Sequence, residues 1–116
     1  MSNQEQEKGK DFIMVEIIQY IPNAVVTKTI LRKTTGNVTL SSFDSGQGLT
    51  EKHSPFDTLI QVIDGQAQVV IDDQSHQLDT GQSLVIPAHS RNSIKANVCF
   101  KMISTVIKSG YEEVSI

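Results

Sequence analysis

The sequence predicts a single all-β domain, and three observations support this fold class. Apolar residues occur in short runs, which Gly, Asn and Asp turn residues separate at regular intervals. The chain has 116 residues, enough for one core and too few for two cores of ordinary size. Aromatic residues make up only 5% and Trp is absent, so the core must come mainly from Ile, Val and Leu, a set that suits strands. Together they favour a closed or nearly closed sandwich or barrel.

The predicted elements follow the turn residues. Residues 1–11 are polar and without periodicity, so we expect a flexible tail, followed by one domain over residues 12–116. Turns are predicted at Pro22-Asn23, Thr35-Gly36-Asn37, Asp64-Gly65 (a hairpin signal), Asp72-Asp73-Gln74 and Thr80-Gly81. Strands are predicted at residues 12–20, 25–32, 38–43, 58–63, 67–71, 76–78, 83–86, 93–96 and 98–107, with a loop over 44–57 and either an edge strand or a loose tail over 108–116.

Charge and composition exclude several classes of partner. The net charge is −3 and no run of Lys or Arg stands out, so we expect neither nucleic-acid nor membrane binding. Cys99 is the only cysteine, which rules out an intramolecular disulfide. No apolar stretch approaches the roughly 20 residues that span a bilayer, and the first residues lack the apolar region of a signal peptide. The expected location is cytoplasmic.

The stretch from Gly48 to Ala96 carries a resemblance to a known family. Gly65 ends the run LIQVIDG, Gly81 opens a second stretch, and Pro87 follows it at a fixed spacing. This pattern resembles the conserved-barrel (cupin 2, RmlC-like) branch of the cupin superfamily. The family's motifs have the forms G-x5-H-x-H-x(3,4)-E-x6-G and G-x5-P-x-G-x2-H-x3-N. The resemblance implies a double-stranded β-helix, the cupin jelly-roll barrel.

The family's metal ligands, three His and one Glu, are mostly replaced. Counted from the glycines, Thr58 stands at the Glu position and Asn92 at the His position of the second motif, while His89 replaces its second glycine. Asn92 suits hydrogen bonding to a ligand better than metal binding. At most one of the family's histidines is therefore retained in place.

His53 is the only histidine of the first motif, and two alignments remain open for it. As the family's first His, it leaves Pro55 at the second position; as the second, it leaves Glu51 at the first. We expect His53 to line a polar pocket without metal. The alternative is a divalent transition metal held by His53, Glu51 and His89, because imidazole and carboxylate together suit such ions.

The alternation of side chains along the strand at residues 58–63 leaves two possible inward faces, one with Thr58, Ile60 and Val62, the other with Leu59, Gln61 and Ile63. The first is favoured, because the resemblance places an inward residue at Thr58. The predicted ligand pocket comprises His53, Thr58, Ile60, Val62, His89 and Asn92.

We therefore predict a protein that binds an unidentified small molecule inside the barrel. The alternative function is a metal-dependent oxygenase or isomerase with an altered ligand set. A purely structural or assembly role is a third class. The resemblance implies a homodimer, and the apolar segment FIMVEIIQY at residues 12–20 fits burial against a partner subunit.

Overall fold

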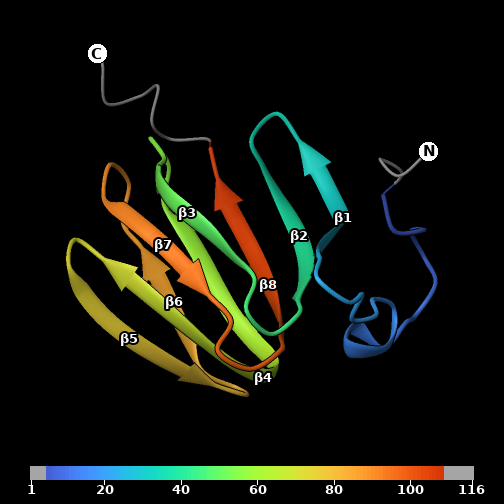
Figure 1. Cartoon of the computed structure of the whole chain (residues 1–116). Helices are drawn as coiled ribbons and strands as arrows, with labels where there is room; N and C mark the ends of the chain where they lie inside the picture. Colours follow the sequence, from blue (N-terminus) through green and yellow to red (C-terminus); the bar gives the residue numbers. More distant parts are fainter. Residues whose placement is uncertain (1–4, 109–116) are drawn as a thin grey trace, which may run out of the picture.

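The computed structural model describes residues 5–108, which form an all-β jelly-roll barrel (Figure 1). Within this range all strand pairings are antiparallel, and no helix is long and apolar enough to cross a membrane. The elements are η1 (Met14–Glu16), β1 (Val25–Lys33), β2 (Gly36–Phe43), β3 (Gly48–His53), β4 (Thr58–Ile71), β5 (Gln74–Asp79), β6 (Ser83–Ile86), β7 (Arg91–Lys95) and β8 (Phe100–Ile107).

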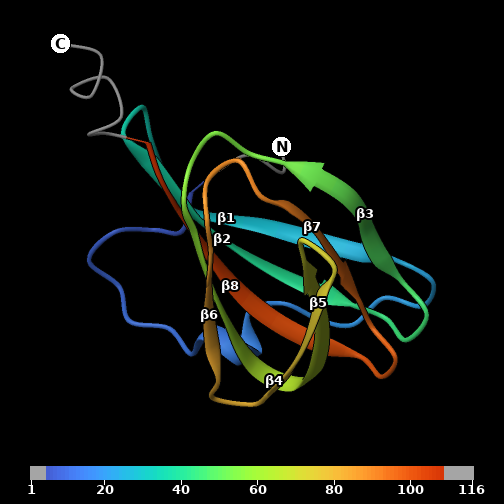
Figure 2. The same cartoon turned by 90° about the vertical axis from the view of Figure 1, so that its left-hand side faces the viewer.

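The strands form two facing sheets that share one strand (Figure 2). One sheet has the order β1-β2-β8-β4-β6, and the other has the order β3-β7-β4-β5. The first half of β4 pairs with β6 and β8, while its second half pairs with β5 and β7. β4 therefore joins the two sheets through its own backbone.

The predicted hairpin at Asp64-Gly65 is wrong, because β4 continues through these residues. A register irregularity between Val62 and Asp64 marks a bulge, and Gly65 has a φ of +82°. A Cβ at Gly65 would lie 2.1 Å from the Cys99 carbonyl oxygen, so only glycine fits this crossing. An Asp-Gly pair supplies a positive φ equally well to a hairpin turn and to a bulge, and here the bulge bends the strand from one sheet into the other.

The sharp hairpin lies further along, at Asp72-Asp73. Both residues have a positive φ, 46° and 72°, and Ile71 pairs with Gln74 across the turn. This is the geometry of a two-residue hairpin of the type that matches strand twist. It connects β4 to β5, as the turn signal in the sequence predicts.

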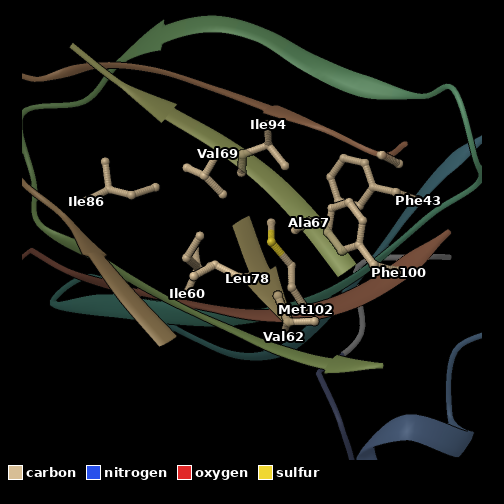
Figure 3. Close-up of a cluster of buried hydrophobic side chains, with 11 residues drawn as sticks. Phe43, Ile60, Val62, Ala67, Val69, Leu78, Ile86, Ile94, Phe100 and Met102 are labelled. Carbon is tan, nitrogen blue, oxygen red and sulfur yellow. The ribbon is translucent and has the colours of Figure 1, made fainter. Parts of the chain in front are cut away.

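The main core fills the space between the two sheets (Figure 3). Ile60 and Val62 are buried, whereas Leu59, which precedes Ile60 on the alternate face of the strand, is 43% exposed. The inward face of β4 is thus the one that the sequence favours. Phe43 and Phe100 stack with ring centroids 4.4 Å apart. The buried members are Phe43, Ile60, Val62, Ala67, Val69, Leu78, Ile86, Ile94, Ala96, Phe100 and Met102.

The strand predicted at residues 12–20 is wrong, because this segment contains only η1 and otherwise irregular backbone. It covers the outer face of the β1-β2-β8-β4 sheet, where Ile18 packs in a second cluster with Ile30 and Leu40. Its apolar character is therefore used at least in part within its own chain. The homodimer stays a prediction, which a measurement of molecular mass in solution tests.

Two smaller differences concern the loop and the tail. β3 lies inside the predicted loop at residues 44–57, since its exposed, polar sequence gives no strand signal. At the N-terminal end, the Gln6 N–H donates to the Ile30 carbonyl at 3.1 Å, and the Arg32 N–H donates to the Glu5 carboxylate. This part of the expected tail therefore follows the edge of β1. Residues 1–4 and the segment 109–116 lie outside the described residues.

Candidate functional site

A cavity of about 320 Å³ lies between the two sheets. Its polar lining residues are Lys52, His53, Ser54, Thr58, Asn92 and Ser104. Its apolar lining residues are Leu49, Ile60, Ile86, Ile94, Met102 and Val106. Figure 3 shows Ile60, Ile86 and Ile94 reaching into the interior from different strands. The cavity is therefore an extension of the core that ends in a polar mouth.

An irregularity in β3 determines which of its side chains face the cavity. Leu49 pairs with Ile94 and Lys52 pairs with Asn92, so two residues of β3 oppose one residue of β7 between these pairs. In a regular strand, residues three apart face opposite sides. The extra residue brings both Leu49 and Lys52 to the inner side. The Asn92 Nδ2 also donates to the Lys52 carbonyl at 3.4 Å.

This register favours a third alignment with the first cupin motif. In this alignment His53 stands at neither of the motif's two His positions. The motif fits as Gly46-x5-Lys52-x-Ser54-x3-Thr58-x6-Gly65. Lys52 and Ser54 then stand at the two His positions, and Thr58 stands at the Glu position. All three residues line the cavity together with Asn92, which has the His position of the second motif. The cavity is thus lined by the four residues that this alignment places at the ligand positions of the motifs.

The other predicted site residues are placed less centrally. His53 lines the cavity and is exposed, and its register partner on β7 is Arg91. His89 is exposed in the loop after β6, has a φ of 67° and does not line the cavity. Its backbone N–H donates to the Ser54 carbonyl at 2.6 Å. Val62 is fully buried and belongs to the core rather than to the cavity wall.

Glu51 also lies outside the cavity lining. Its carboxylate Oε2 is 3.0 Å from Arg91 Nε, in an ion pair at the surface. The structure therefore brings His53, Thr58, Ile60 and Asn92 together, and leaves Glu51, Val62 and His89 outside the lining. The sequence reasoning missed Lys52 and Ser54; the only signal for them is the motif spacing.

The residues present do not fit a transition metal. Within residues 5–108, no group of three or more His, Cys, Asp or Glu side chains could hold a metal ion. The positions that correspond to the family's ligands carry an ammonium group, two hydroxyls and a carboxamide, whereas such ions prefer imidazole, thiolate and carboxylate. The set His53, Glu51 and His89 is not assembled around one point.

Solved structures resemble this chain over nearly its whole length. A conserved protein of unknown function from Streptococcus pyogenes is 25% identical, with a TM-score of 0.85, 93% of this chain covered and 96% of the other. A cupin superfamily protein from Desulfitobacterium hafniense is 24% identical, with a TM-score of 0.83 and coverages of 90% and 96%. A cupin 2 conserved barrel domain protein from Leptotrichia buccalis is 28% identical, with a TM-score of 0.81; the match covers 84% of this chain and 47% of that one.

No protein-family model matches the sequence, and no curated protein is significantly similar to it. The structural likeness nevertheless identifies the class: the chain has the cupin fold. Its structural neighbours include cupins of the conserved-barrel and RmlC-like types. Within this fold, Lys52, Ser54, Thr58 and Asn92 line the cavity together.

Proposed function

We propose that the protein binds a small organic molecule in the cavity between its sheets, without the metal chemistry usual for the cupin family. The cavity itself carries this proposal, because it combines an apolar floor with a few polar groups at the mouth. Ligand sites generally have this composition. A volume of about 320 Å³ corresponds to about ten water molecules, and therefore suits a ligand of about ten non-hydrogen atoms.

The binding test uses two neighbouring residues of β8. Ser104 is half-buried and lines the cavity, whereas the next residue, Thr105, pairs with the exposed Leu59 on the outer face. The Ser104→Leu variant fills the cavity, and Thr105→Leu adds apolar volume outside it. We expect benzoate, benzamide, benzylamine or indole to bind the wild type in an NMR titration, with binding lost in Ser104→Leu and kept in Thr105→Leu. Lack of binding by all four compounds, or equal binding by both variants, contradicts the proposal.

Metal content provides an independent check. Protein purified without a histidine tag is analysed for Fe, Mn, Ni and Zn, and we expect none of these in stoichiometric amount. A near-stoichiometric metal that disappears in His53→Ala would overturn the proposal in favour of a metal-dependent enzyme.

A further inference from the structure

We propose that the ligand is an organic anion, a monocarboxylate with an apolar body, and that Lys52 binds its carboxylate at the mouth of the cavity. This inference deepens the proposed function and rests on it. The cavity lining supplies two kinds of contact, a lysine ammonium with several hydroxyl groups and a set of apolar side chains. A molecule that is charged at one end and apolar at the other matches both.

The ionisable residues that line the cavity are all basic. None of the described residues that line the cavity is acidic, whereas Lys52 and His53 both belong to the lining. The nearby Glu51 carboxylate is bound by Arg91 at 3.0 Å, and Arg91 also contacts the Asp73 carboxylate at 3.2 Å. These two negative charges are thus paired with an arginine outside the cavity lining.

Lys52 lines the cavity from an exposed position, and its charge has no partner among residues 5–108. Its pairing with Asn92 holds the backbone in place, and its side chain makes no ion pair or hydrogen bond with residues 5–108. A lysine ammonium is a compact positive charge with three donors, so one ammonium suits one carboxylate group. Among the residues that line the cavity, the Lys52 ammonium therefore offers an anion the strongest electrostatic attraction.

The hydroxyl groups of the cavity lining add neutral donors. The Thr58 and Ser104 hydroxyls make no hydrogen bond with other side chains or backbone groups in the described part of the chain. Asn92, which is 8% exposed, donates one long hydrogen bond to Lys52. A carboxylate has only acceptors, and it can therefore use these donors together with the ammonium. A neutral ligand of the same shape uses the apolar floor equally well and gains less at the mouth.

The test compares benzoate with benzamide, which has nearly the same shape without the charge. Calorimetric titrations at low salt use the full chain and two variants, Lys52→Met and Lys28→Met. Methionine keeps much of the lysine stem and removes the charge; Lys28 lies on β1 away from the cavity, so its variant controls for the overall loss of a positive charge. Thermal melting verifies that both variants are folded.

We expect benzoate to bind the wild type about tenfold more tightly than benzamide, the difference that one charge-assisted contact supplies. Lys52→Met should weaken benzoate binding about tenfold and change benzamide binding less than about twofold, while Lys28→Met leaves both unchanged. Equal affinities for the two compounds, with both lost in Ser104→Leu, overturn the anion proposal and leave the cavity proposal standing. If neither compound nor octanoate binds, the anion proposal is overturned. If benzylamine and indole also fail to bind, the cavity proposal is overturned with it.

Discussion

The Tyr20 hydroxyl donates a hydrogen bond of 2.6 Å to Asp64 Oδ2 and so ties the N-terminal segment to the bulge of β4. Lys101 lies on the same patch, with its Nζ 4.9 Å from the centroid of the Tyr20 ring and 2.7 Å from the Val15 carbonyl oxygen to which it donates. The segment at residues 12–20 is thus held to the outer face by directional contacts as well as by the burial of Ile18. These contacts form where β4 passes from one sheet to the other.

A double-mutant cycle measures the strength of this contact. Tyr20→Phe keeps the ring over Lys101 and removes the hydroxyl, and Asp64→Ala removes the acceptor. We expect a coupling free energy of about 1.5–3 kcal/mol between the two sites, as for hydrogen bonds to charged groups. Chemical denaturation of the four proteins gives this value. Additive effects of the two changes would show that the contact does not stabilise the fold.

The same tyrosine predicts a dependence of stability on alkaline pH. Burial, together with the hydrogen bond to Asp64, raises the pKa of Tyr20 above its ordinary value of 10. The unfolded chain therefore loses this proton near pH 10 while the folded chain keeps it, so the stabilisation is complete below that pH and is lost as the pH rises above it. We expect the free energy of unfolding to fall by at most about 1.4 kcal/mol per pH unit more than in Tyr20→Phe. Denaturation curves from about pH 9 to about pH 11 check this, and parallel curves for the two proteins contradict it.

Gly65 and Gly81 form a matched pair for testing the crossing of β4. Both have a positive φ, of 82° and 93°, but only a Cβ at Gly65 meets backbone atoms, since the space around Gly81 is open. Gly81→Ala should cost about 1–2 kcal/mol, the penalty of the left-handed backbone conformation. Gly65→Ala should cost clearly more, because the new methyl group overlaps the Cys99 carbonyl. Equal losses of stability in urea denaturation would argue against a tight crossing.

Restoring the family's ligands tests the alignment of the first motif. A variant with Lys52→His, Ser54→His, Thr58→Glu and Asn92→His carries three imidazoles and a carboxylate at cavity-lining positions. We expect it to bind about one Zn or Ni ion per chain, with a rise in melting temperature on addition of the metal.

The control for this graft follows the alternative alignment. It retains His53 as the second histidine and carries Glu51→His, Thr58→Glu and Asn92→His. Because Glu51 lies in a surface ion pair outside the cavity, the control should bind metal at least about tenfold more weakly. Tighter binding by the control than by the graft would refute the alignment through Lys52.

The sequence was sufficient for the fold class and for most of the strands along the chain, because alternation and turn residues are local signals. The turn at Asp72-Asp73 and the inward face with Ile60 are examples. Local signals gave the wrong secondary structure at two places, where contacts with distant parts of the chain determine the backbone conformation. Asp64-Gly65 has the composition of a hairpin, yet long-range pairing extends β4 through it. Residues 12–20 are apolar enough for a strand, but they meet a sheet face rather than a sheet edge.

The site was less predictable than the fold, because one extra residue in β3 determines which of its side chains line the cavity. From the sequence alone, His53 is the conspicuous residue, and Lys52 is an ordinary surface lysine. The irregularity between Leu49 and Lys52 brings the exposed Lys52 into the cavity lining, and no local sequence pattern predicts a bulge in an exposed, polar strand. Thr58 and Asn92 were found because the glycine and proline spacings fix their positions independently of β3.

The continuity of β4 through both sheets restricts how a guest molecule reaches the interior. The backbone of β4 runs through both sheets. The sheets therefore cannot move apart as rigid bodies without breaking the hydrogen bonds around Val62 and Gly65. In the described part of the chain, β3 pairs with one strand only, β7, and carries the irregular stretch next to Lys52. β6 likewise pairs with one strand only, β4, and contributes Ile86 to the cavity lining. The edges of the two sheets at β3 and β6 are therefore the parts of the cavity wall that can move without disturbing β4.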